Sequence, residues 1–131
     1  MNSIAVLLTC HNRKDITTSC LQRLFVLKPD VDVFCVDDSS IDGTPEAIAQ
    51  KFPQVHLIHG DGSLFWCRGM NLAWAKAKEN ADYDYYLWLN DDLFLYDNAF
   101  DEILNCSQLN NDRAIIGGIV LIILNSVILR Q

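Results

Sequence analysis

Two adjacent carboxylates follow a short apolar run in the second half of the chain. The five bulky side chains of Tyr85–Leu89 are typical of a strand buried on both faces of a parallel sheet. Asn90, Asp91 and Asp92 come next, where that strand leaves the core. In open α/β sheets, ligands bind beyond the carboxyl ends of the strands. Two acids at that place repel each other unless a cation arrives, so these residues predict a divalent metal ion that carries a phosphate group.

Two other predicted strands also end in polar clusters, Thr9–Arg13 and Asp37–Ser40. The carboxyl ends of parallel strands converge on one edge of a sheet, so the clusters predict a nucleotide pocket there. In that pocket Thr9 and Asp38 would hydrogen-bond a base. Asp91 would bind a ribose hydroxyl, and Asp92 a metal on the diphosphate. The alternative is that Asp, Asn and Ser are simply common in βα loops, where they cap helices.

Strands and helices alternate along the chain, which predicts an α/β domain with a mostly parallel sheet and helices on both faces. The predicted strands are Ser3–Thr9, Val31–Val36, Val55–Ile58 and Tyr85–Leu89. The predicted helices are Ile16–Leu27, Pro45–Phe52 with Thr44 as N-cap, Met70–Lys78 and Asn98–Ser107. No linker or internal repeat is visible, so residues 1–131 are expected to form a single domain.

The composition narrows the choice of partner and compartment. The net charge of −7 over 131 residues argues against nucleic acid or an anionic membrane surface as the main partner. Five cysteines without Cys-x-x-Cys spacing favour buried, reduced thiols. No signal peptide is visible at the start, and the apolar stretch Arg113–Leu124 is interrupted by Gly117 and Gly118, so no transmembrane segment is expected. We therefore predict a cytoplasmic protein, with the inner face of the membrane as a peripheral alternative.

Five motifs in order resemble a family 2 glycosyltransferase over about residues 3–100. They are Val6-Leu7-Leu8-Thr9-Cys10-His11-Asn12-Arg13, Val36-Asp37-Asp38-Ser39-Ser40-Ile41-Asp42-Gly43-Thr44, Gly60-Asp61-Gly62-Ser63-Leu64-Phe65-Trp66, Gly69-Met70-Asn71 and Leu87-Trp88-Leu89-Asn90-Asp91-Asp92. The resemblance implies the Rossmann-like GT-A fold and transfer of a sugar from a nucleoside-diphosphate donor with inversion. The Asn90–Asp92 triplet stands in the place of that family's Asp-x-Asp-type motif.

The resemblance also implies roles for individual residues. Thr9 and His11 would line the base pocket, Asp38 would bind the base, and Asp91 would contact the ribose. Mg²⁺ or Mn²⁺ would be bound by Asp92. The loop from Asp61 to Trp66 and the start of the next helix, near Gly69 and Asn71, would lie close to the donor sugar. Asn12, Arg13 and Asn90 complete the expected substrate-binding set.

The chain departs from the family pattern at two places. Arg68 stands where a small residue is usual, and it could either pair with the diphosphate or obstruct the sugar. The chain also ends at Gln131, before the acceptor-binding half that carries the general base. The catalytic base is therefore expected beyond Gln131. The isolated chain is expected to bind a nucleotide sugar and to transfer it poorly or not at all, to an acceptor such as a glycan or a lipid-linked glycan.

Two other classes of protein stay open at the level of the sequence. A non-catalytic nucleotide-binding or partner subunit from a truncated gene could use the apolar stretch Ile115–Leu129 to self-associate. A phosphoacceptor receiver domain would suit Asp37 and Asp38 after a strand, but it needs a late lysine, and none follows Lys78. The three tryptophans, Trp66, Trp74 and Trp88, are predicted to be core residues rather than a platform for sugars.

Overall fold

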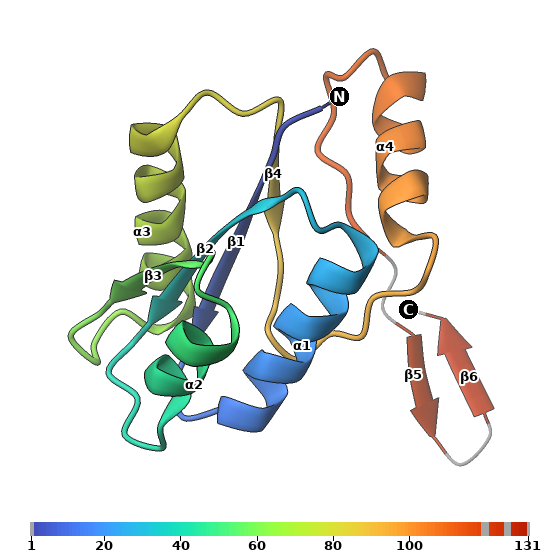
Figure 1. Ribbon diagram of the computed structural model, residues 1–131. Helices are drawn as coiled ribbons and strands as arrows, with labels where there is room; N and C mark the ends of the chain where they lie inside the picture. The colour runs from blue at the N-terminus through green and yellow to red at the C-terminus, as the bar shows by residue number, and fades with distance from the viewer. Residues whose placement is uncertain (1, 119–120, 125–126, 131) are drawn as a thin grey trace. The chain divides into compact units, whose positions relative to one another are not determined.

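The computed structural model describes residues 2–118, 121–124 and 127–130. The chain divides into two compact units, residues 1–95 and 96–131. The first unit carries every predicted site residue. Along the chain it contains β1 (Ile4–Cys10), α1 (Lys14–Leu27), β2 (Asp32–Asp37), α2 (Thr44–Lys51), β3 (His56–His59), α3 (Phe65–Asn80) and β4 (Tyr85–Trp88) (Figure 1).

The four strands of the first unit form one sheet in the order β3-β2-β1-β4, and every neighbouring pair is parallel. Ala5 of β1 lies opposite Asp32 of β2, and Ile4 lies opposite Tyr85 of β4. All four strands therefore end at the same edge of the sheet. The predicted α/β class and parallel sheet are confirmed.

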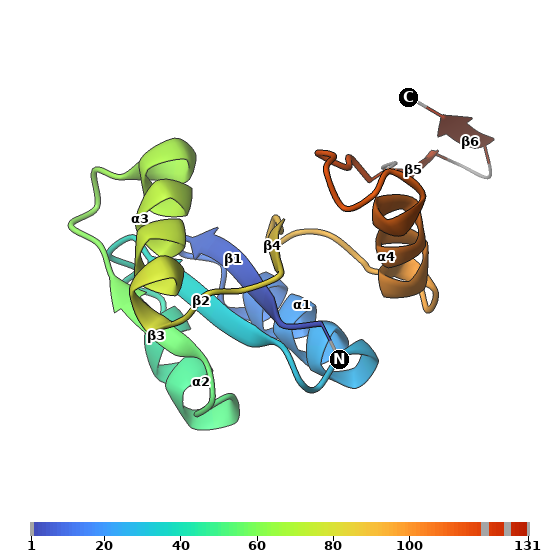
Figure 2. The same ribbon diagram turned by 90° about the horizontal axis from the view of Figure 1, so that it is seen from above.

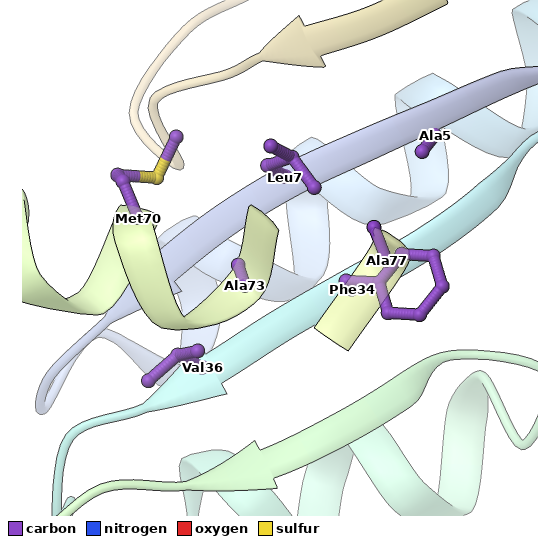
Figure 3. Close-up of a cluster of buried hydrophobic side chains, with 7 residues drawn as sticks. All are labelled: Ala5, Leu7, Phe34, Val36, Met70, Ala73 and Ala77. Atoms are coloured by element: carbon purple, nitrogen blue, oxygen red, sulfur yellow. The ribbon is translucent and has the colours of Figure 1, made fainter. Parts of the chain in front are cut away.

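Helix α3 covers one face of the sheet (Figures 1 and 2). Figure 3 shows its contact with β1 and β2, where seven buried side chains meet: Ala5, Leu7, Phe34, Val36, Met70, Ala73 and Ala77. The positions that α3 presents to the strands follow one another at spacings of three and four residues, as one helical face requires. Because Ala73 and Ala77 are small, the helix axis can lie close to the strands.

Helices α1 and α2 lie on the opposite face (Figure 2). Leu21 and Leu24 of α1 and Ile48 of α2 are completely buried. The two helices meet through Phe25 and Phe52, whose ring centroids are 5.8 Å apart. Helices on both faces thus agree with the prediction, and the strand ends are left uncovered between the two layers.

The prediction for the strand before the acids is wrong in one respect. Strand β4 spans Tyr85–Trp88 at the edge of the four-stranded sheet, and none of its four residues is fully buried, so it is not buried on both faces. The side chain of Trp88 is 42% exposed, whereas Leu89 just after the strand is buried. A run of bulky residues does not distinguish a central strand from an edge strand whose large rings cover one another.

Two predicted helix starts also need correction. Helix α3 begins at Phe65, not at Met70, so Trp66 belongs to its first turn and not to a loop. Gly69 suggested a break but lies inside the helix, where it packs against Thr9. Helix α2 begins at Thr44 itself, and the preceding Gly43 adopts a φ of 85°.

The second unit contains α4 (Ala99–Leu109), close to the predicted helix, and the antiparallel pair β5 (Leu121–Leu124) and β6 (Val127–Arg130). Parts of the predicted apolar stretch Ile115–Leu129, at positions 119–120 and 125–126, lie outside the described residues. Among the helices of the described residues, none combines the length and the hydropathy needed to cross a bilayer.

Candidate functional site

Two cavities open where β1, β2 and β4 end. One has a volume of about 270 Å³ and is lined by Thr9, Cys10, His11, Arg13, Asp38, Gly62, Phe65, Trp66 and Asp91. The other has a volume of about 320 Å³ and is lined by Thr9, Arg13, Trp66, Asn90, Asp91 and Asp92. They adjoin, because four residues line both. The predicted convergence of the three polar clusters is therefore present in the structure.

The acidic pair that follows β4 is bound by an arginine from the loop after β1. Arg13 Nη1 lies 2.9 Å from Asp91 Oδ1 and 3.4 Å from Asp92 Oδ2. The Asp91 carboxylate raises the pKa of Arg13 above its usual value, so the guanidinium is charged. The cation that two adjacent acids require is thus supplied by the protein itself.

Asp91 and Asp92 differ in their surroundings. Asp91 is buried, and its second oxygen, Oδ2, accepts a hydrogen bond of 2.9 Å from the hydroxyl of Thr17 on α1. The side chain of Asp92 is 51% exposed, and its one ion pair among the described residues is the longer contact, 3.4 Å, with the same Nη1 of Arg13. Asp92 is therefore the carboxylate that can change partner at little cost.

Asp38 organises the loop between β3 and α3. Its Oδ1 accepts the backbone N–H of Gly62 at 2.8 Å, and its Oδ2 accepts those of Leu64 and Phe65, both at 3.0 Å. Phe65 is held at a φ of 53°, which is unusual for an aromatic residue. A carboxylate offers about four lone-pair directions, and three are used here. One lone pair on Oδ1 is left without a hydrogen bond among the described residues, and Asp38 lines the first cavity.

His11 and Asn12 join the loop after β1 to the loop after β2. His11 Nδ1 donates to the carbonyl oxygen of Asp38 at 2.6 Å, and its Nε2 then accepts from Asn12 Nδ2 at 3.1 Å. The side-chain oxygen of Asn12, Oδ1, accepts a hydrogen bond from the backbone N–H of Ile41 at 2.8 Å. His11 lines a cavity and Asn12 does not. Asn12 therefore acts on the shape of the site through the two loops.

Trp66 forms a wall of both cavities. Its indole Nε1–H donates to Asn90 Oδ1 at 2.9 Å, and its ring meets Trp88 edge to face with centroids 5.9 Å apart. Trp66 is half exposed, so the prediction that it belongs to the core is wrong. The reason is that its indole N–H reaches Asn90 beside the cavity, which keeps the ring at the surface.

Besides Asn12, three predicted site residues do not line either cavity. Asp61 is exposed and accepts hydrogen bonds from the backbone and hydroxyl of Ser63. Asn71 is exposed on α3. Gly69 lies behind the cavity wall, where an added Cβ would come 3.0 Å from Thr9 Cβ. Gly69 contributes by letting α3 approach Thr9.

Two residues of the site are not among the predicted ones. Cys10 lines the cavity that Asp38 borders, and Thr17 fixes Asp91. Gly62 and Phe65 line the same cavity and belong to the loop from Asp61 to Trp66, which is expected near the donor sugar. Hydrogen bonding to Cys35 and burial raise the pKa of Cys10, so its thiol is not a nucleophile at neutral pH. The only available signal for Thr17 was its position one helical turn after Arg13, on the same face of α1.

The carboxylates of the site fit a divalent cation that shares its ligands with a phosphate group. The described residues contain no group of three or more His, Cys, Asp or Glu side chains placed to hold a metal. Mg²⁺ is usually bound by one or two carboxylates together with substrate phosphates and water, not by a complete protein cage. Asp92, exposed and next to Asp91, fits that requirement.

The model of the family "Glycosyl transferase family 2" matches residues 5–130. The fold is similar to that of a mannosyltransferase, PcManGT from Pyrobaculum calidifontis, solved in complex with GDP-Man and Mn²⁺ (TM-score 0.67, 17% identity, covering 81% of this chain and 32% of that chain). It is also similar to S. aureus TarS 1–349 in complex with UDP-GlcNAc (TM-score 0.66, 16% identity, 83% and 32%).

These solved neighbours share the GT-A fold with this chain, which spans about a third of their length. No curated protein sequence matches the chain. The family model, in contrast, covers nearly all of its residues, including every strand end that contributes to the two cavities. The chain belongs to glycosyl transferase family 2.

Proposed function

We propose that residues 1–131 are the donor-binding part of an inverting glycosyltransferase and bind a nucleoside-diphosphate sugar together with Mg²⁺ or Mn²⁺. The observation that carries the proposal is that Asp38 and the Asp91–Asp92 pair, 53 positions apart in the sequence, border adjoining cavities at one sheet edge. Solved neighbours bound to GDP-Man with Mn²⁺ and to UDP-GlcNAc support this class of ligand.

The geometry suggests a role for each group. Thr9 and the free lone pair of Asp38 Oδ1 would hold the base, beside His11. Asp91 keeps one lone pair on each oxygen beyond its bonds to Arg13 and Thr17, enough to accept a ribose hydroxyl. Trp66, held by its hydrogen bond to Asn90, would form one wall of the space that the donor sugar occupies.

Asp92 would hold the cation on the diphosphate. When bound, the cation would offset the negative charge that grows on the departing nucleoside diphosphate. The acceptor hydroxyl would attack the sugar carbon from the far side. The acceptor, a glycan or a lipid-linked glycan, and the cytoplasmic location are part of the same proposal.

A thermal-shift panel of nucleotide sugars, with and without Mn²⁺, tests the proposal. We expect one or a few nucleotide sugars to raise the Tm, more with Mn²⁺, and Asp92→Ala to abolish the additional rise. Asp82→Ala is the matched control, since it removes an exposed carboxylate that precedes β4, at the opposite end of the strand. If no nucleotide sugar raises the Tm, or if Asp92→Ala keeps the full Mn²⁺ effect, the proposal is wrong.

A further inference from the structure

A single nitrogen of Arg13 serves both acids of the site, and it serves them unequally. Nη1 lies 2.9 Å from the buried Asp91 and 3.4 Å from the half-exposed Asp92. A charged hydrogen bond is strong near 2.8 Å and in a buried setting, and it weakens with distance and with access of water. The contact of Arg13 with Asp91 is therefore the stable one, and its contact with Asp92 is readily exchanged.

The contact between Arg13 and Asp91 is held in place by the fold. Asp91 is bonded at one oxygen by Arg13, just before α1, and at the other by Thr17, one turn into α1. Thr17 is completely buried, so it cannot move aside without disturbing the helix. The unit of Arg13, Asp91 and Thr17 would remain in place whether or not Asp92 stays in contact with it.

Most of the hydrogen-bonding capacity of Arg13 is unused. Its Nη2 and Nε have no hydrogen-bond partner among the described residues, and its side chain is 45% exposed. Arg13 lines both cavities. A guanidinium presents its N–H groups as a planar fork that matches two phosphate oxygens. The free part of the fork is therefore available to an anion in the cavities.

We propose that Arg13 is a resident counter-ion of Asp92: it competes with a divalent cation for that carboxylate and binds the diphosphate through its free nitrogens. The second half rests on the proposed function. A cation that arrives alone must displace one positive group from Asp92 and remain beside it. A diphosphate that arrives with the cation offsets both positive charges, so the two ligands enter together.

The first test uses Mn²⁺ alone, followed by the electron paramagnetic resonance signal of the free ion. Wild type should bind Mn²⁺ weakly, and Arg13→Gln should bind it at least about tenfold more tightly, because the competing charge is gone. Arg13→Lys keeps a positive charge and should remain close to wild type. Equal or weaker binding of Mn²⁺ by Arg13→Gln overturns the proposal.

The second test uses UDP and GDP in the presence of EDTA. Whichever nucleotide wild type binds without metal should lose at least about tenfold in affinity in Arg13→Gln, which corresponds to about 1.4 kcal/mol. Unchanged metal-free binding in Arg13→Gln overturns the diphosphate contact. If wild type binds neither nucleotide even with Mn²⁺, the proposed function fails, while the test with Mn²⁺ alone still decides the competition.

A matched pair of variants protects the test against misfolding of Arg13→Gln, which leaves Asp91 buried without its cation. Asp91→Asn removes the buried charge and keeps Arg13, and Arg13→Gln/Asp91→Asn removes both partners of the pair. The double variant should bind Mn²⁺ at Asp92 more tightly than Asp91→Asn does. Equal affinities of these two proteins would contradict the competition.

Discussion

The contact between Gly69 and Thr9 gives the sharpest prediction about how the fold shapes the site. Gly69 is buried in α3, and a methyl group at this position would overlap Thr9 Oγ1 and come 3.0 Å from Thr9 Cβ. Thr9 belongs to β1, which lies inside the sheet and is paired with β2 on one side and β4 on the other. The strand cannot yield, so Thr9 or α3 must shift.

Gly69→Ala should lower both stability and ligand binding. Overpacking of this kind costs about 1–3 kcal/mol, and the gain in helix propensity from glycine to alanine returns up to about 1 kcal/mol. We expect a net loss of up to about 2 kcal/mol in the free energy of unfolding, measured by urea denaturation. Because Thr9 lines both cavities, the Tm rise caused by a nucleotide sugar should shrink as well.

A second substitution separates this cause from a general effect of alanine. Thr9→Ala removes the hydroxyl and methyl groups that the new Cβ would meet, so Gly69→Ala should cost less in the Thr9→Ala background than in wild type. Gly118→Ala is the control, since no described atom lies within 4 Å of a Cβ there. A Gly69→Ala protein as stable as wild type, or an identical cost in both backgrounds, refutes the reasoning.

Three further predictions follow from the contacts described. Asp38→Asn should lower the free energy of unfolding by about 1–3 kcal/mol in urea, because an amide cannot accept all three loop N–H groups; unchanged stability would contradict this. At pH 8 iodoacetamide should label the exposed Cys67 and spare Cys20, whose pKa burial and the charge of Asp91 raise to about 12; mass spectrometry of the native protein decides. Hydrogen bonds from Thr44 lower the pKa of the Asp42 carboxyl in the folded protein. The contribution of Asp42 to stability is therefore present above its unfolded pKa of about 3.9 and is lost as the pH falls through the lower folded pKa. The Tm difference between wild type and Asp42→Asn should shrink in acid, and a Tm difference that stays constant with pH would count against this.

The convergence of the site could be predicted because it depends only on topology. Alternating strands and helices imply a parallel sheet, and parallel strands end at one edge. Any polar residue directly after such a strand must lie near that edge. This is why Thr9, Asp38 and Asp91 were identified as neighbours from their positions in the sequence alone, and the cavity lining agrees.

The errors share a physical cause, which is that exposure and helix ends depend on neighbours distant in sequence. Trp66 and Trp88 are large apolar residues of the kind that usually lies in a core. However, β4 is an edge strand, and the two rings pack against each other beside the cavities. Gly69 resembles a helix breaker, yet its lack of a side chain serves the contact between α3 and Thr9. Local propensity could not reveal either arrangement.

The order of residues along the chain is enough to predict the alternation of elements, the kinds of polar groups at the strand ends and the motifs typical of the family. The pairing of those groups depends on the folded chain. Arg13 and Asp91 are 78 positions apart, and nothing local links them; their contact exists because β1 and β4 lie side by side and α1 starts beside both acids. The strength of an ion pair depends on the distance between the two charges in space, and this distance is set only when the chain folds.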